Sequence, residues 1–126
     1  MAKILVVDDS AYARRVHRKI LESADHSVVE AGSGLGALES FGLERPDVVL
    51  LDLSMEDVGG LDVLRQIRHM RPDACVIVVS ADVQRSTADE IRGAGATGFI
   101  AKPVRGEDLL ASIASLCPEP RGGAQL

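Results

Sequence analysis

The sequence predicts an α/β fold in which a parallel β-sheet is covered by helices on both faces. Short apolar runs rich in β-branched residues alternate with longer segments whose apolar residues recur at helical spacing. This alternation repeats five times with short connections, which is typical of parallel strands joined by helices. Several of the runs are apolar without interruption, as expected of strands that are buried on both faces.

The most informative strand is the run of apolar residues from Val48 to Leu51, which ends in Asp52. Open α/β sheets bind their ligands at the carboxyl ends of the strands. Asp52 is therefore expected to emerge at that edge from a central strand. Aspartate also often begins a turn after a strand, so this residue alone does not establish a site.

The first half of the chain is expected to hold three strands and two helices. Ser10 can cap the first helix, in which Val16 and Leu21 belong to an apolar stripe, and Pro46 ends the second helix. In chain order we expect these elements over Lys3–Val7, Ala11–Ser23, Ser27–Ala31, 35–43 and 48–51.

The second half continues the alternation with three helices and two strands. Leu61, Leu64 and Ile67 lie at helical spacing, and Pro72 separates their helix from the next apolar run. In chain order we expect these elements over 61–70, 74–79, 83–94, 97–101 and Gly106–Leu116.

Composition excludes several classes of function. The net charge is −5 and the only aromatic residues are one tyrosine and two phenylalanines, so neither an electrostatic nor a base-stacking surface for nucleic acid is expected. The sequence contains neither a segment long enough to span a membrane nor a signal-peptide pattern. We therefore expect a cytoplasmic protein that binds neither membranes nor nucleic acid directly.

The two cysteines, Cys75 and Cys117, lack the spacing of a zinc or redox motif. We expect reduced, structural thiols and neither a disulfide nor a zinc site. Residues 1–117 should form one domain, and the Pro- and Gly-containing residues 118–126 a C-terminal tail or linker. A stand-alone protein is favoured over a fragment because the chain ends soon after the last expected helix.

The first helix carries many basic residues outside its apolar stripe. A solvated face is the default interpretation, and a docking surface for an acidic partner helix is the alternative. The basic residues are Arg14, Arg15, His17, Arg18 and Lys19. The three histidines, His17, His26 and His69, share no metal-binding spacing, and we expect them at the surface.

A glycine-rich segment, Gly32 to Ala37, matches the dinucleotide-binding pattern G-x-G-x-x-A, and Asp52 follows Gly32 by the expected distance for a ribose-binding acid. However, the chain is too short for two mononucleotide-binding halves, and a dinucleotide would not explain Asp8 or Lys102. We favour a glycine-rich turn that leads into a helix, and keep a nucleotide-binding α/β domain as the less favoured alternative.

Polar residues follow four of the predicted strands. Because parallel strands end at the same edge of a sheet, Asp8, Asp9, Asp52, Ser80 and Lys102 should converge. Carboxylates gathered in one cleft repel each other and recruit a cation, and oxygen ligands favour Mg²⁺. A metal ion and a lysine can neutralise phosphoryl oxygens while Asp52 acts as a nucleophile that forms an aspartyl phosphate.

These motifs, in this order and spacing, resemble the receiver domain of two-component response regulators. The resemblance covers residues 3–116 and rests on Asp8-Asp9, the strand ending in Asp52, Gly60, Ser80-Ala81 and Lys102-Pro103. It implies a flavodoxin-like doubly wound five-stranded parallel sheet of order 2-1-3-4-5 with five helices, as in the single-domain chemotaxis regulators. The predicted domain, residues 1–117, would then be the receiver domain.

The resemblance also implies roles for individual residues. Asp52 would accept a phosphoryl group from a sensor histidine kinase or a histidine phosphotransfer protein, and Ser80 and Lys102 would contact the phosphoryl oxygens. Asp8, Asp9, Asp52 and the backbone carbonyl of Ser54 would bind Mg²⁺ or Mn²⁺. The protein would thus catalyse only its own phosphorylation and dephosphorylation.

Three further residues would adjust or report the phosphorylated state. Ser54 and Asp82 occupy the positions that tune dephosphorylation, and Phe99 matches the aromatic residue that switches the partner-binding surface. The Lys102-Pro103 peptide is expected to be cis. The downstream protein is unknown, the chain would be a monomer or a phosphorylation-dependent dimer, and a phosphorylation-independent pseudo-receiver remains the alternative.

Overall fold

Strands and helices alternate strictly along the chain in a computed structural model that describes residues 1–54, 58–82 and 84–117. Residues 118–126, the expected tail, lie outside the described residues. The strands are β1 (Lys3–Val7), β2 (Ser27–Ala31), β3 (Val48–Asp52), β4 (Cys75–Ser80) and β5 (Gly98–Ala101). The helices are α1 (Ala11–Ser23), α2 (Gly34–Glu44), α3 (Gly60–Met70), α4 (Arg85–Gly93) and α5 (Gly106–Leu116).

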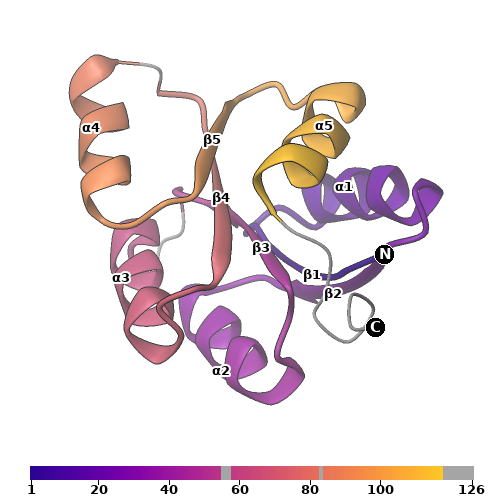
Figure 1. Ribbon diagram of the computed structural model, residues 1–126, viewed down its shortest axis with the longest axis horizontal. Coiled ribbons are helices and arrows are strands. Elements are labelled where there is room, and N and C mark those ends of the chain that lie inside the picture. The colour runs from indigo at the N-terminus through magenta and orange to yellow at the C-terminus, as the bar shows by residue number, and fades with distance from the viewer. Residues whose placement is uncertain (55–57, 83, 118–126) are drawn as a thin grey trace.

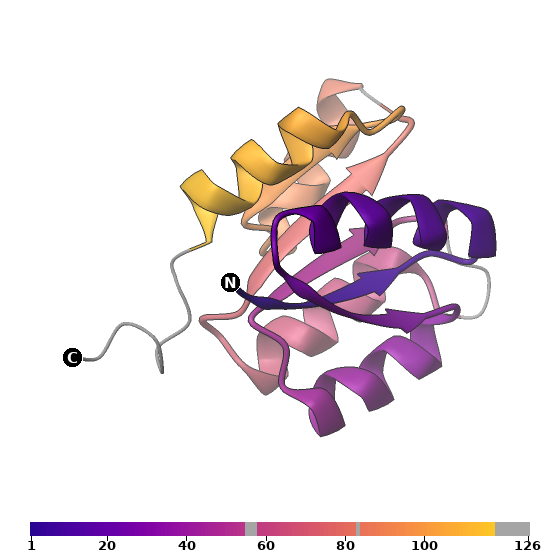
Figure 2. The same ribbon diagram turned by 90° about the vertical axis from the view of Figure 1, so that its right-hand side faces the viewer.

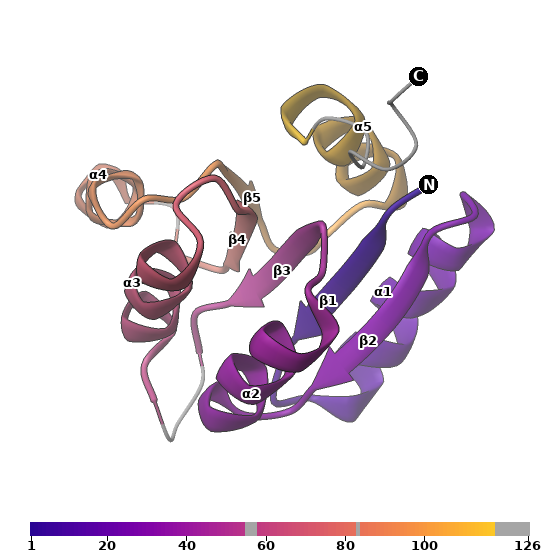
Figure 3. The same ribbon diagram turned by 60° about the horizontal axis from the view of Figure 1, so that its bottom comes forward.

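The strands form a single parallel sheet of order β2-β1-β3-β4-β5, seen side by side in Figure 3. β3 lies at the centre, with Val48 opposite Ile4 on β1 and opposite Cys75 on β4. Every residue of β3 is buried. The strand order implied by the family resemblance is confirmed, and the uninterrupted apolar run is explained by helices on both faces.

Helices cover the sheet on both sides (Figure 1). Leu5 and Val7 of β1 face the core beneath α2, α3 and α4, whereas Ile4 and Val6 face the core beneath α1 and α5. This separation follows from the alternation of side chains along a strand. The doubly wound fold is therefore confirmed.

Local capping agrees with the sequence at the first helix. The hydroxyl oxygen of Ser10 accepts a hydrogen bond from the backbone nitrogen of Ala13, as an N-cap does. Ser33 caps α2 in the same way, through the backbone nitrogen of Gly36. The bounds of α1, α5, β1 and β2 are as predicted, and the other elements differ from the prediction by up to two residues at an end.

The glycine-rich turn has a packing role. A Cβ atom on Gly34 would lie 2.7 Å from Cβ of Val58, because α2 starts against the segment that leads into α3. No real side chain tolerates that approach, so glycine is required there. The structure thus shows the predicted glycine-rich turn that leads into a helix.

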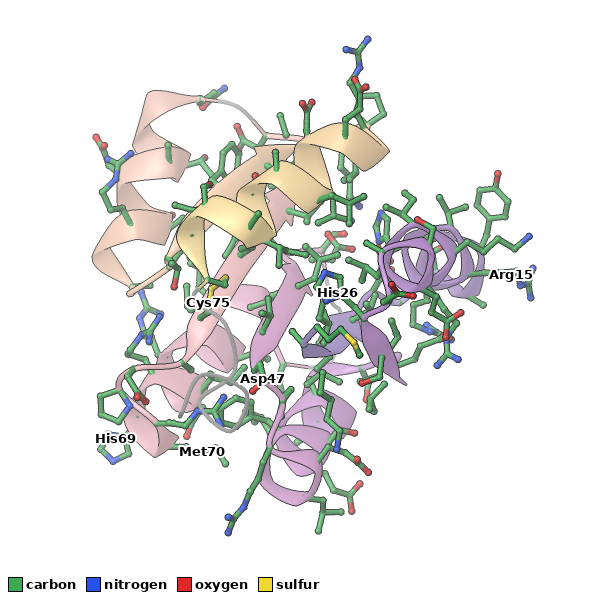
Figure 4. All side chains as sticks on the ribbon, turned by 45° about the vertical axis from the view of Figure 1, so that its right-hand side comes forward. Arg15, His26, Asp47, His69, Met70 and Cys75 are labelled. Atoms are coloured by element: carbon green, nitrogen blue, oxygen red, sulfur yellow. A yellow bond between two sulfur atoms is a disulfide. The ribbon has the colours of Figure 1, made fainter. Side chains whose placement is uncertain are left out.

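The expectation for the cysteines is wrong. Cys75 and Cys117 form a disulfide between the first residue of β4 and the residue that follows α5 (Figure 4). They are 42 positions apart, and the topology brings their Cα atoms to 5.7 Å, within the usual range for a disulfide. Two cysteines so far apart in the sequence have no characteristic spacing, so the sequence alone could not identify this pair.

The expectation for the histidines is wrong in part. His17 is buried on the inner side of α1 together with Leu21, one turn further along the helix. His26 is half-buried, and its Nδ1 accepts a hydrogen bond from the backbone nitrogen of Ala2 at 3.0 Å. Only His69 is exposed as predicted. Within the described residues, no helix is long and apolar enough to cross a membrane.

Candidate functional site

The strands place the predicted polar residues along one edge of the sheet. Asp52 and Ser80 are the last residues of β3 and β4, Asp8 directly follows β1, and Lys102 directly follows β5. Figure 2 shows these strands pointing toward the same end of the molecule. The convergence predicted from parallel topology is confirmed.

Three carboxylates form the acidic part of the site. Asp8, Asp9 and Asp52 each offer one oxygen, and these oxygens all lie within 4.8 Å of one another. Asp8 and Asp52 are 2 % and 3 % exposed, whereas Asp9 is exposed. Such a group of oxygen ligands suits a hard divalent cation.

Asp8 shows why a cation fits this cluster. Its Oδ1 accepts a hydrogen bond from the backbone nitrogen of Ser10 at 2.9 Å, but its buried Oδ2 has no hydrogen-bond partner among the described residues. Burial raises the pKa of Asp8, and the negative charge of Asp52 acts in the same direction. A cation would supply the missing partner and the missing charge.

Asp52 is held by two neighbours in the cleft. Nζ of Lys102 lies 3.3 Å from Oδ1 of Asp52, and the hydroxyl of Ser54 donates a hydrogen bond to Oδ2 at 2.8 Å. A buried carboxylate needs a counter-charge or donors, and here it has both. The predicted site residues Lys102 and Ser54 are thus in contact with Asp52. Ser54 contacts it through its side chain and its backbone nitrogen. The role of the Ser54 carbonyl as a metal ligand stays a prediction.

Ser80 and Asp82 are linked at the end of β4. The hydroxyl oxygen of Ser80 accepts a hydrogen bond from the backbone nitrogen of Asp82 at 3.0 Å. The Asp82 carboxylate accepts hydrogen bonds from the backbone nitrogen of Gln84 and the hydroxyl of Thr87, and these bonds lower the pKa of Asp82. Asp82 is therefore tied to the first turn of α4, a contact with Thr87 that the sequence did not suggest.

A cavity of about 560 Å³ opens beside Asp52, Ser80 and Lys102. Gly60 forms part of its wall, and a Cβ atom there would lie 2.6 Å from Cα of Leu53. The glycine allows α3 to begin directly against the segment that follows Asp52. This close approach explains why the motif requires glycine at that position.

Phe99 lies on β5, one strand from Ser80. It is half-buried and packs against the core on the α2–α4 side of the sheet. It also lines a groove of about 430 Å³ with α5 residues such as Ala111 and Ser115. This position is compatible with a switch role, which stays a prediction. The peptide bond between Lys102 and Pro103 is cis, as expected.

His17 is a neighbour of the site that sequence reasoning missed. Burial lowers its pKa, and the positive charge of Lys102 adds to the effect while Asp52 opposes it. Its position one turn before Leu21 on the same helix face was the available signal, because i and i+4 residues share a face.

The chain matches the response regulator receiver domain model over residues 4–114. The chemotaxis protein CheY of Listeria monocytogenes is 36 % identical over 114 residues, which cover 90 % of this chain and 96 % of CheY. The sensory/regulatory protein RpfC of Xanthomonas campestris is also 36 % identical, and the match covers 94 % of this chain but 17 % of RpfC.

Solved structures agree with the sequence comparison. Chemotaxis protein CheY4 of Vibrio cholerae superimposes with a TM-score of 0.88 at 28 % identity, covering 92 % of this chain and 98 % of CheY4. A CheY-like receiver domain protein from Methanospirillum hungatei gives a TM-score of 0.85 at 28 % identity and covers 90 % of each chain. With its strand order and its cluster of acids, this chain belongs to the response regulator receiver domain family of two-component signalling systems.

Proposed function

We propose that Asp52 is the phosphoacceptor of this receiver. The observation that carries the proposal is that the carboxylate of Asp52 is close both to the acids Asp8 and Asp9 and to the Lys102 ammonium, which lies 3.3 Å from its Oδ1. An oxygen of Asp52 attacks the phosphorus of a phosphohistidine, the phosphorus–nitrogen bond breaks, and its electron pair returns to the imidazole. The donor is a sensor histidine kinase or a histidine phosphotransfer protein.

The acidic cluster is the proposed site for Mg²⁺ or Mn²⁺. Asp8, Asp9 and Asp52 would hold the ion together with the carbonyl of Ser54. When bound, the ion supplies positive charge that neutralises phosphoryl oxygens. Oδ2 of Asp8 has no hydrogen-bond partner in the part of the chain that the structure describes, and this supports the assignment because a buried carboxylate oxygen without a donor is costly.

The remaining site residues would complete the phosphoryl pocket. Lys102 would move from the Asp52 carboxylate to a phosphoryl oxygen, and the Ser80 hydroxyl would donate to another. Ser54 and Asp82 flank the cavity from which water attacks the phosphoryl group, so they would set the rate of hydrolysis. The protein would thus catalyse only its own phosphorylation and dephosphorylation.

The proposed output is binding to a downstream protein. If Ser80 moves toward the phosphoryl group, Phe99 can turn into the vacated space and repack the surface of α4, β5 and α5. The phosphoryl group biases these two arrangements only through its different contacts in each. The protein would act in the cytoplasm, without direct binding to nucleic acid or membranes, as a monomer or a phosphorylation-dependent dimer.

Incubation with acetyl phosphate and Mg²⁺, followed by intact-mass measurement, tests this proposal. We expect the wild-type protein to gain one phosphoryl group and to lose that gain when Mg²⁺ is omitted. Asp52→Asn should gain none. Asp62→Asn, which changes an exposed acid on α3, is the matched control and should behave as the wild type does. A wild-type protein that gains no mass and binds no beryllofluoride would instead be a phosphorylation-independent receiver.

A further inference from the structure

Arg14 of α1 reaches from its helix to the ends of β1 and β2. Its Nη1 donates a hydrogen bond to the backbone carbonyl of Asp8 at 2.6 Å, and its Nε donates to Oε1 of Glu30 on β2 at 3.0 Å. The side chain of Arg14 is 20 % exposed. The default interpretation, that the basic residues of the first helix form a solvated face, is therefore wrong for Arg14.

Glu30 holds two arginines at once. Its second oxygen, Oε2, lies 2.8 Å from Nε of Arg18. That contact is an ion pair and not a hydrogen bond, because Nε of Arg18 has no hydrogen-bond partner within the described part of the chain. Arg18 also donates from Nη2 to the carbonyl of Val28 at 3.0 Å. Glu30 thereby fixes the guanidinium of Arg14 against β2.

Gly32 provides the space that Arg14 occupies. A Cβ atom on Gly32 would lie 3.0 Å from Nη1 of Arg14, the same nitrogen that binds the Asp8 carbonyl. This contact is tighter than side chains normally make, so even alanine would require the guanidinium to shift. The contact between Arg14 and the Asp8 carbonyl therefore depends on the absence of a side chain at position 32.

The peptide group to which Arg14 donates its hydrogen bond joins the two proposed metal ligands, Asp8 and Asp9. The backbone nitrogen of Asp8 donates to the carbonyl of Ala31 at 3.1 Å, and its carbonyl accepts from Arg14. The turn is therefore held on both sides of Asp8. Hydrogen bonds that orient metal ligands commonly change metal affinity when they are removed.

We propose that Arg14 is a positioning residue for the cation site, acting through the Asp8 carbonyl with Glu30 and Gly32 as its supports. The proposal rests on the proposed binding of Mg²⁺ by Asp8 and Asp9. Charge alone predicts the opposite sign of effect: removing a cation near an acidic cluster should strengthen the binding of Mg²⁺. Loss of positioning should weaken it, so the direction of the change separates the two explanations.

Calorimetric titration of the intact chain with Mg²⁺ tests the proposal. We expect Arg14→Met to weaken binding by about 10- to 100-fold. Arg14→Lys keeps the positive charge and one donor but cannot bind the Asp8 carbonyl and Glu30 at the same time. Its affinity for Mg²⁺ should therefore lie between those of Arg14→Met and the wild type. Arg15→Met is the matched control, because the neighbouring side chain is exposed and points away from the sheet (Figure 4).

Gly32→Val provides a second variant that keeps Arg14 and its charge while displacing the guanidinium. It should weaken Mg²⁺ binding in the same direction. The thermal midpoint without metal is measured for every variant, because a purely structural role would lower that midpoint and leave the affinity of the folded protein unchanged. Equal or tighter Mg²⁺ binding by Arg14→Met would overturn the proposal, whereas a wild-type protein that binds no Mg²⁺ would overturn the proposed function itself.

Discussion

Asp52 and Asp8 illustrate how single residues are adapted to this site. Both carboxylates are almost fully buried, which is unfavourable unless charge or donors compensate. Asp52 has Lys102 and Ser54, whereas Asp8 has one donor and one oxygen without a partner among the described residues. These neighbours are what the proposed roles require, with Asp52 as an oriented nucleophile and Asp8 as a ligand of a cation.

His17 should make the stability of the fold depend on pH. Because burial lowers its pKa in the folded state, the unfolded chain takes up a proton at a higher pH than the native protein does. Below its ordinary pKa of about 6.5, the free energy of unfolding should therefore fall as pH falls, by up to about 1.4 kcal/mol per pH unit. Above that pH, the ionisation of His17 should contribute no pH dependence.

The measurement is denaturant unfolding of the wild type and His17→Leu between about pH 5.5 and pH 8. The difference in free energy of unfolding between the two proteins should change in favour of His17→Leu as pH falls. The pH dependence that the two proteins share cancels in the comparison. A pH-independent difference would show that His17 is not held in its neutral form.

At the scale of elements, the disulfide joins the end of α5 to the start of β4. Leu116, the last residue of α5, also packs against Gly98, where a Cβ atom would lie 2.4 Å from Cδ1 of Leu116. Both contacts hold α5 at the edge of the sheet opposite the acidic cluster. The helix that borders the proposed output surface is therefore fixed at one end by covalent bonding and close packing.

Breaking this bond should destabilise the protein. The crosslink joins residues 42 positions apart, and constraining a loop of that length in the unfolded chain is worth up to about 4 kcal/mol. We expect reductant to lower the free energy of unfolding of the wild type toward that of Cys117→Ala. Chemical denaturation with and without reductant checks this, and Cys117→Ala is its own control because reductant should not affect it. Equal stability of the oxidised and reduced wild type would contradict the prediction.

At the scale of the whole molecule, the strand ends could be predicted from the sequence because parallel topology alone brings them together. The order of the elements alone is enough to place four residues along one edge of the sheet: Asp8, Asp52, Ser80 and Lys102. The sheet order itself was carried over from the family resemblance. Repetition of strand and helix predicts a parallel sheet but not which strands are neighbours.

Other features could not be predicted because they depend on how separate elements pack. Cys75 and Cys117 form a disulfide only because α5 ends beside β4. The hydrogen bond from Arg14 to the Asp8 carbonyl depends on Glu30 of β2 and on the space left by Gly32. None of these pairs has a characteristic spacing. Tertiary contacts between residues of ordinary type leave little signal in a single sequence.

The most direct measurement locates the phosphoryl group within the chain. The protein is phosphorylated with acetyl phosphate and Mg²⁺ and then reduced with borohydride, which converts an aspartyl phosphate to homoserine, and its peptides are sequenced by mass spectrometry. We expect homoserine at position 52 and unmodified aspartate at Asp8, Asp9 and Asp82. Homoserine at any of those three positions, with Asp52 unchanged, would overturn the assignment of Asp52 as the phosphoacceptor.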